Sequence, residues 1–295
     1  MQNSNLSLLK IEEAVSLINR AKSILDELEV KVIEDENETQ MYEASNQTFN
    51  LELNPSNSFQ NFIEGKSNKL ARMAGLSIAE HPEITNYTPF IIYGASGCGK
   101  SHLVNAIGVR YKEMHPENKV LYLSAHLFMM HYNDAILRNY YNNFMLFYQS
   151  VDMLIVDDIQ DWSDASKTLK AVSQIVSHLV HCGKQVILTC NILPRKLKGF
   201  DKKLLSCFSC GLVVELEKPD VELCIDILNH KCNCDGLKLS KEILDLIAKS
   251  ANTSVCDLVN VYNSLKAYST LNNISIDMHL AKQVIERLVK SLLIA

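Results

Sequence analysis

The sequence predicts an α/β domain, in which helices cover both faces of a parallel sheet, followed by a small all-α domain. Three observations predict this fold. Short apolar runs, typical of buried strands, alternate with helical patterns between residues 90 and 218. A glycine-rich loop joins the first apolar run to a helical pattern. After Pro219 no strand pattern recurs, and four helical patterns follow at 220–234, 240–252, 255–271 and 276–293.

The elements of the α/β part can be placed in order along the chain. Near-continuous apolar runs predict strands at 90–94, 119–125, 151–159, 185–191 and 211–219. Apolar residues at helical spacing predict helices at 101–114, 127–150 and 166–183, the last of them stopped by Gly183. Because helices separate the strands, we expect the strands to run parallel.

The N-terminal region differs from the rest of the chain. Apolar residues at helical spacing over 5–30 predict an amphipathic helix, which either packs on the main domain or pairs with a partner. The acidic, polar stretch 34–47 is typical of a linker. We therefore expect three segments: an N-terminal helix and linker at 1–47, the α/β domain at 48–218 and the helical domain at 219–295.

Composition limits the class of protein. The 295 residues are 47% hydrophobic and carry a formal net charge of −5, so any nucleic-acid surface must be a local patch. No apolar stretch approaches the ~18–20 residues needed to span a bilayer, and the N-terminus has no signal-peptide pattern. With nine cysteines, we expect a cytoplasmic chain with reduced thiols and no membrane contact. The pairs Cys207/Cys210 and Cys232/Cys234 have weak zinc spacing, which favours free thiols.

Residues 94–101, GASGCGKS, fit the phosphate-binding pattern G-x-x-x-x-G-K-[ST] between a predicted strand and helix. Glycines let backbone N–H groups curl around phosphates, and the helix N-terminus adds its positive dipole end. Lys100 can reach the β- and γ-phosphates, and the Ser101 hydroxyl can ligate Mg²⁺. We therefore expect ATP or ADP with Mg²⁺, held by Gly94, Ala95, Ser96, Gly97, Cys98, Gly99, Lys100, Ser101 and His102.

Two acids, Asp157 and Asp158, end the apolar run of the third predicted strand. A carboxylate at this place forms the second half of a phosphate-loop site, where Asp157 is expected to hold Mg²⁺ through water. The alternative is that both acids lie in a solvated turn.

Three further stretches, 49–80, 150–160 and 185–200, resemble the AAA+ module of the DnaA family of bacterial chromosomal replication initiators. The resemblance covers about residues 48–290 and implies an AAA+ fold with a helical lid, and a role in replication initiation or its control. It implies that Asp158 polarises the attacking water and that Asn191 is the polar sensor I residue, unless Asn191 only caps a turn. It also places Phe62, Ile63 and Gly65 beside the adenine ring.

The chain departs from the family at two phosphate-facing positions. By the resemblance, Cys207 in KLLSCF takes the place of the arginine finger, and Cys256 in VCDL takes that of the sensor II arginine. A thiol lacks the charge and the fork of donors of a guanidinium group. We therefore expect a protein that holds a nucleotide with weak or absent hydrolysis.

DNA contacts are also sparse. The resemblance assigns 127–150 to the family's insertion, whose Tyr and Phe residues either stack on single strands or, as we favour, pack inside the protein. Residues 161–169 contain only Lys167 as a cation, and the basic run 194–203 is more typical of a solvated face. No helix-turn-helix pattern follows the helical domain. We expect weak single-strand binding at most and no specific duplex binding.

Three functions stay open at this point. The first is an ATP-binding protein of replication initiation or its regulation. The second is a catalytically inactive DnaA paralogue that binds replication proteins or DnaA-like subunits as an interaction module. The third is an active ATPase of the helicase-loader type. The segments at 49–80 and 150–160 favour the first two, and the two cysteines favour the second over an ordinary initiator.

Overall fold

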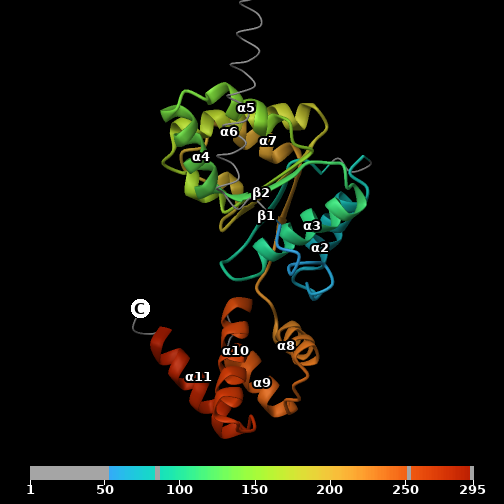
Figure 1. Ribbon diagram of the computed structural model, residues 1–295, viewed down its shortest axis with the longest axis vertical. Coiled ribbons are helices and arrows are strands. Elements are labelled where there is room, and N and C mark those ends of the chain that lie inside the picture. The colour runs from blue at the N-terminus through green and yellow to red at the C-terminus, as the bar shows by residue number, and fades with distance from the viewer. Residues whose placement is uncertain (1–52, 84–86, 251–253, 293–295) are drawn as a thin grey trace, which may run out of the picture.

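The computed structural model describes residues 53–83, 87–250 and 254–292. The predicted N-terminal helix and linker lie outside these residues. Figure 1 shows an α/β domain above a helical bundle, and the two are joined by the short segment that follows β5.

The α/β domain is built on five parallel strands in the order β2-β3-β4-β1-β5. This order brings the carboxyl ends of β1 and β3 to either side of the end of β4, and in open α/β sheets ligands bind outside these carboxyl ends. The parallel sheet is as predicted. The strands are β1 (Phe90–Tyr93), β2 (Val120–Ser124), β3 (Met153–Asp157), β4 (Gln185–Cys190) and β5 (Leu212–Glu215).

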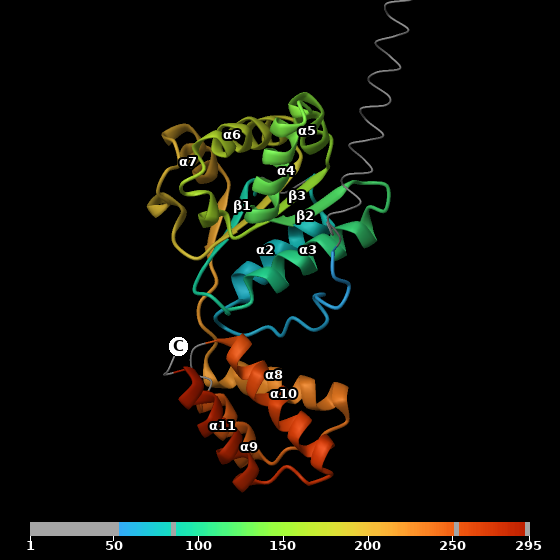
Figure 2. The ribbon, with the colours of Figure 1, turned by 60° about the vertical axis from the view of Figure 1, so that its left-hand side comes forward.

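Helices cover both faces of the sheet, as Figure 2 shows. One layer holds α2 (Lys69–Glu80) and α3 (Lys100–Met114). The other holds α4 (Ala125–Leu137), α5 (Tyr141–Gln149), α6 (Ser166–His181) and α7 (Lys202–Cys210), with the short 3₁₀ turns η1 (Ile159–Trp162) and η2 (Pro194–Lys196). Successive strand side chains point to opposite faces, so Met153 and Ile155 pack in the first layer, while Leu154 and Val156 pack in the second.

Two details differ from the sequence prediction. The stretch 127–150 forms two helices, because the backbone of Asn139 is left-handed with a φ of 61° and interrupts the helical path between α4 and α5. The sequence prediction did not include the helices α2 and α7 as separate elements.

The helical bundle has its own apolar core, formed where α8, α9, α10 and α11 meet. Asp220 accepts a hydrogen bond from Leu223 N at 2.8 Å, and this bond caps the start of α8. The four predicted helices are present: α8 (Val221–Asp235), α9 (Lys241–Ser250), α10 (Val255–Asn272) and α11 (Met278–Leu292). The domain boundary at residue 219 stays a prediction, although the change from sheet to bundle falls between β5 and α8.

Candidate nucleotide-binding site

The glycine-rich loop leads from the end of β1 into α3, as its sequence predicts. Gly97 has a φ of 76°, in the left-handed region that side chains rarely adopt. A Cβ at Gly97 would also lie 2.5 Å from the Cβ of Ser254, at the start of the bundle helix α10. Both the backbone conformation and the close approach of α10 therefore require glycine at this position.

Lys100 is the first residue of α3, and its side chain is buried. Its Nζ donates hydrogen bonds to the carbonyl oxygens of Gly94 (2.9 Å) and Ala95 (3.0 Å). An ammonium group has three donors, so these two bonds leave one donor for an anion at the loop. Ser101, the next residue, is exposed.

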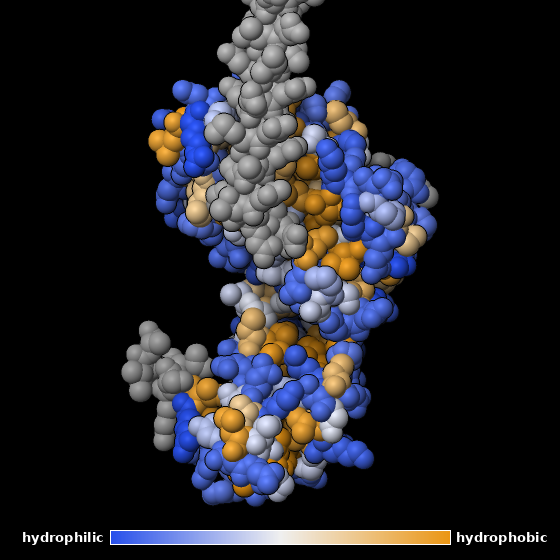
Figure 3. All heavy atoms as spheres, viewed as in Figure 1, coloured by the Kyte–Doolittle hydropathy of each residue, from blue (hydrophilic) through white to orange (hydrophobic). Residues whose placement is uncertain are grey.

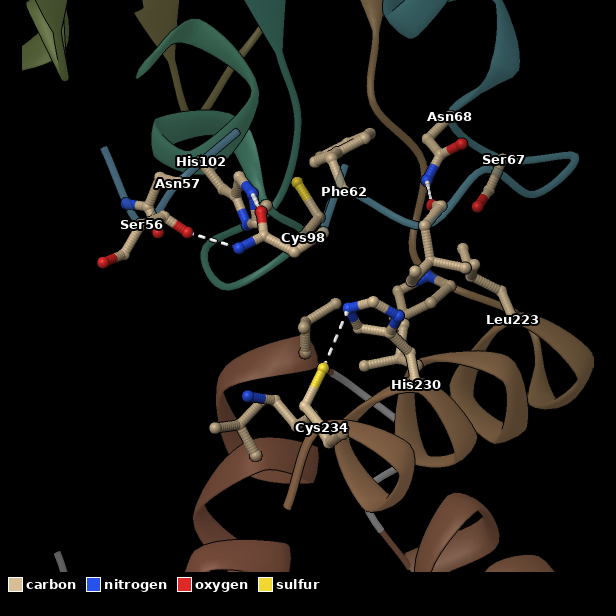
Figure 4. A pocket seen from close by; sticks show the side chains of 18 of the residues that line it. Ser56, Asn57, Phe62, Ser67, Asn68, Cys98, His102, Leu223, His230 and Cys234 are labelled. Atoms are coloured by element: carbon tan, nitrogen blue, oxygen red, sulfur yellow. Dashed lines mark hydrogen bonds between the residues drawn. The ribbon is translucent and has the colours of Figure 1, made fainter. Parts of the chain in front are cut away.

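A cavity of about 460 Å³ lies between the α/β domain and the bundle. Figure 4 shows Phe62, Cys98 and His102 on the upper side of this cavity, opposite His230 and Cys234 from α8. Among the predicted site residues, the cavity brings together Phe62, Ile63, Cys98, Gly99 and His102, and its opposite wall includes Leu223, Ile227, His230, Lys231, Cys234, Val255 and Val259.

The remaining predicted residues of the loop and its surroundings lie outside this cavity wall. Gly65 stands beside it, where an added Cβ would be 3.0 Å from both δ carbons of Leu223. The residues that do not line the cavity are Gly94, Ala95, Ser96, Gly97, Lys100, Ser101, Asp157, Asp158 and Asn191. Two residues of the phosphate loop, Cys98 and Gly99, therefore line the cavity, whereas Lys100 and the acids lie outside its wall.

His102 lines the cavity. Its ring contacts Phe62 edge-on, with ring centroids 5.3 Å apart, and burial lowers the pKa of the imidazole. The His102 Nε2 lies 2.9 Å from Asn61 Oδ1 and 3.2 Å from the carbonyl oxygen of Ser58. Both partners are acceptors, so Nε2 carries the proton of the neutral ring. The sequence analysis did not single out Asn61 or Ser58.

Asp157 ends β3 with its side chain almost fully buried. One of its oxygens, Oδ1, accepts a hydrogen bond from the Thr189 hydroxyl of β4, and Oδ2 accepts one from the Tyr122 hydroxyl of β2 at 3.3 Å. Burial, followed by the negative charge of Asp157, raises the pKa of Tyr122, so Tyr122 stays protonated and able to donate. A solvated turn does not describe Asp157.

Asp158 follows in a left-handed conformation, with a φ of 61°. Its backbone N–H donates to Thr189 Oγ1 at 2.9 Å, and its carboxylate accepts from Gln160 Nε2 at 3.0 Å. The Gln160 Oε1 accepts from the backbone N–H of Asn191 at 3.1 Å. Gln160 therefore brings the end of β3 close to the residue that follows β4.

No local sequence pattern assigns a role to Tyr122, Thr189 or Gln160. The one available signal was Thr189 itself, a hydroxyl in the otherwise apolar run QVILTC. Asn191 is exposed where the sequence predicts a strand end, and only its backbone takes part in the hydrogen bond to Gln160.

The two cysteine positions lie in different surroundings. Cys256 is exposed in the first turn of α10, and its Cβ would be 3.7 Å from a Cβ added at Gly97. Cys207 is partly buried on α7, where it packs against the core of the second helix layer, and burial raises the pKa of its thiol. All nine cysteines are free thiols, and no group of three or more His, Cys, Asp or Glu residues within the described ranges could hold a metal ion.

The bundle touches the phosphate loop directly at α10. The backbone N–H of Val255 donates to the Gly97 carbonyl oxygen at 2.8 Å. The Ser254 hydroxyl, which caps α10, accepts from Asp257 N at 3.0 Å. The first turn of α10 is thus fixed against the loop by a backbone contact.

The fold and the site together define the class of protein to which the chain belongs. A five-stranded parallel sheet, a phosphate loop after β1, an acid pair after β3 and a following helical bundle are the features of an AAA+ nucleotide-binding module. Comparison with known proteins identifies the family: residues 53–215 match the model of the bacterial DnaA ATPase domain, and the chain belongs to this family. The family prediction is thereby confirmed.

Individual relatives agree with this assignment. The chain is 46% identical over 238 residues to the chromosomal replication initiator protein DnaA of Bacteroides fragilis, and 45% identical over 237 residues to that of Bacteroides thetaiotaomicron. These alignments cover 81% and 80% of this chain but 50% of each relative. The chain spans about half the length of the curated relatives it matches.

Solved structures resemble the chain over the same region. Domain III of DnaA from Thermotoga maritima has a TM-score of 0.76 and 29% identity, and the alignment covers 80% of this chain and 98% of that one. A replication initiator DnaA bound to AMPPCP and single-stranded DNA has a TM-score of 0.68 and 32% identity, covering 72% and 66%. In the parts of the chain that the structure describes, no helix has the length and apolar character to cross a membrane.

Proposed function

We propose that this chain binds ATP or ADP with Mg²⁺ and acts in the initiation of chromosomal replication or in its control, with weak or absent hydrolysis. The observation that carries the proposal is a contrast within one site. Lys100 and Asp157 are buried and hydrogen-bonded, whereas the position beside the loop where the family has an arginine is the exposed Cys256.

The cavity and the phosphate loop would hold different parts of the nucleotide. The base occupies the cavity next to Phe62, Ile63 and His102, and Gly65 shapes its edge. The phosphates lie in the loop, where the remaining donor of Lys100 and the N–H groups at the start of α3 face them. A related DnaA has been solved with the nucleotide analogue AMPPCP, which supports the binding of a nucleotide by this chain.

Ser101 and Asp157 would hold Mg²⁺. The donors present fit this ion, because Mg²⁺ in such sites uses one or two protein oxygens and completes its shell with phosphate and water. When bound, the ion neutralises charge on the phosphate oxygens.

Hydrolysis needs more than this chain supplies. By the resemblance to the family, Asp158 would polarise the attacking water and Asn191 would contact the water or the terminal phosphate. The charge that develops on the phosphate then lacks two guanidinium groups, because Cys207 and Cys256 carry none. An arginine finger is worth about 10³–10⁵ in rate in well-studied phosphate-loop enzymes, so turnover should be very slow.

The bundle acts as the lid of the site, since it supplies one wall of the cavity and contacts Gly97. Partners of the chain are replication proteins or DnaA-like subunits. Single-stranded DNA is bound weakly at most: the rings of Phe128, Phe144 and Tyr148 on α4 and α5 are buried and contact one another edge-on or tilted, which favours packing over base stacking.

A titration with ATP and ADP, beside a steady-state ATPase assay, tests the proposal. We expect both nucleotides to bind with similar affinity in Mg²⁺ and product to form at a rate near the background. A chain that binds neither nucleotide would contradict the proposal. Fast hydrolysis would instead support the loader-type ATPase.

A further inference from the structure

Thr189 lies in the interior of the sheet and yet carries a hydroxyl group. It is fully buried in β4, where the neighbouring positions are apolar. Burying a hydroxyl without a hydrogen bond costs free energy, and valine has the same branched shape without this cost. The contacts of the Thr189 hydroxyl therefore indicate what the residue does.

The hydroxyl makes two contacts of opposite kind. It donates its single proton to Asp157 Oδ1 and accepts the backbone N–H of Asp158 at 2.9 Å. One oxygen atom on β4 thus holds the side chain of the first acid and the backbone of the second. These contacts fix the chain at the point where β3 ends and the left-handed turn at Asp158 begins.

The two acids consequently have different partners. Asp157 accepts from the hydroxyls of Thr189 and Tyr122, whereas the Asp158 carboxylate accepts from Gln160. The amide of Gln160 has one orientation that fits, because a carboxylate only accepts and the Asn191 N–H only donates. Two adjacent negative charges are thereby stabilised by separate donors and do not compete for the same one.

We propose that Thr189 is a positioning residue for the acid pair, which holds Asp157 in the orientation that receives Mg²⁺ and at the same time fixes the turn that carries Asp158. The inference rests on the proposed function, since it needs Asp157 to face the ion. Residues that hydrogen-bond to metal ligands typically change metal affinity about 10–100-fold when they are replaced. Thr189 donates to the carboxylate that would hold the ion through water, so we expect its effect in this range.

The experiment measures Mg²⁺ dependence and not turnover. Binding of ADP labelled with a methylanthraniloyl group is followed by fluorescence, first in EDTA and then during a titration with MgCl₂. In Thr189→Val, the Mg²⁺ concentration for half-maximal response should rise about 10–100-fold, whereas binding in EDTA should stay near that of the wild type. Thr189→Ser keeps the hydroxyl and should titrate like the wild type.

Two further variants separate positioning from packing. Thr168→Val alters another buried threonine, on α6 in the second helix layer, and should leave the Mg²⁺ titration unchanged. Tyr122→Phe removes the longer bond to Asp157, at 3.3 Å, and should shift the titration less than Thr189→Val. Should Thr189→Val fail to fold, Thr189→Ala takes its place with the same expectation.

The outcomes distinguish this inference from the proposed function. If Thr189→Val melts at a lower temperature but titrates with Mg²⁺ like the wild type, Thr189 is only structural and the inference is overturned. If the wild type binds no nucleotide, or binds it equally with and without Mg²⁺, the proposed Mg²⁺ site fails and this inference fails with it.

Discussion

The residues proposed to hold the nucleotide and its ion differ in burial from the residues at the two proposed arginine positions. Lys100, Asp157 and Thr189 are each at most 6% exposed and are hydrogen-bonded within the α/β domain. Cys256 is exposed, and Cys207 lies on α7 at the edge of a core. Changing a buried, bonded group disturbs packing as well as binding, whereas the exposed Cys256 can change with little effect on the fold. Under the proposed function, an arginine at this position could therefore be lost while the residues needed for binding are kept.

The largest expected effect is a gain of ATP hydrolysis when arginines are placed at both cysteine positions. In the double variant Cys207→Arg with Cys256→Arg, we expect ATPase activity to rise by about 10³-fold or more and ATP-dependent oligomers to form, because charge on the terminal phosphate is again neutralised. A phosphate-release assay and light scattering measure the two effects. Cys182→Arg, at an exposed cysteine after α6, is the matched control. Robust wild-type turnover that neither substitution alters would contradict the comparison.

The second prediction concerns Lys100, one of the buried residues in this comparison. Lys100→Ala should abolish binding of ATP and ADP, because it removes the cation of the phosphate loop. For the wild type, ligand at 100 times Kd should add about 2.7 kcal/mol to the free energy of unfolding, and thermal denaturation with Mg-ATP should show no such gain for the variant. The control is Lys249→Ala, an exposed lysine of α9. A wild type whose melting temperature does not respond to nucleotide would refute the binding assignment.

The third prediction concerns His131, a buried histidine of α4 that lies outside the proposed nucleotide site. Burial lowers the pKa of His131 on α4 from 6.5 to about 4, although Asp134 acts in the opposite direction, and His131 Nδ1 lies 2.8 Å from the Tyr148 hydroxyl. The unfolded chain then takes up a proton between these two pKa values, while the folded chain does not. Stability should therefore fall by roughly 3 kcal/mol as the pH drops from 6.5 to 4, with little further loss from this group below that range.

Urea denaturation at several pH values measures this slope for the wild type and for His131→Asn, which should lack it. His126→Asn, at an exposed histidine of the same helix, should keep the wild-type slope. The slope should also be the same with and without nucleotide. An equal slope in all three proteins would show that another group carries the pH response.

The smallest expected effect compares two glycines. Gly97 and Gly183 both have left-handed backbones, with φ of 76° and 69°, so alanine should cost about 1–2 kcal/mol at either site. A Cβ at Gly183 meets nothing within 4 Å, whereas one at Gly97 meets Ser254. Only Gly97→Ala should therefore also weaken nucleotide binding, by displacing the start of α10 from the loop. Equal affinities in the two variants would mean that the contact between α10 and the loop does not affect binding.

The parts of the site that the sequence predicts are those whose residues are adjacent along the chain. The phosphate loop and the acid pair are local motifs, and their strand contexts follow from short apolar runs. The aromatic residues of 127–150 were assigned to packing by preference, and Phe144 and Tyr148 are indeed fully buried.

The parts that were not predictable depend on distant segments meeting. His230 and Cys234 of α8 line the cavity opposite Cys98 and Gly99 of the loop. This arrangement depends on the packing of the bundle, which no local sequence pattern predicts. The contacts of Tyr122, Thr189 and Gln160 join β2, β3 and β4, and they depend on strand order and register. The inward packing of Cys207 was hidden for a similar reason, because α7 is short and its buried face is set by the helix layer around it.

Residues of both the α/β domain and the bundle line the cavity, and this affects how the protein unfolds. Figure 3 shows apolar side chains gathered at the junction, where the top of the bundle faces the α/β domain. Each body has its own core, and between them lie the cavity and the contact from Val255 to Gly97. A base that fills the cavity would touch both bodies, so it would add to the energy that keeps them together. Without nucleotide the two cores should denature in separate steps, and with nucleotide the steps should merge into one cooperative transition.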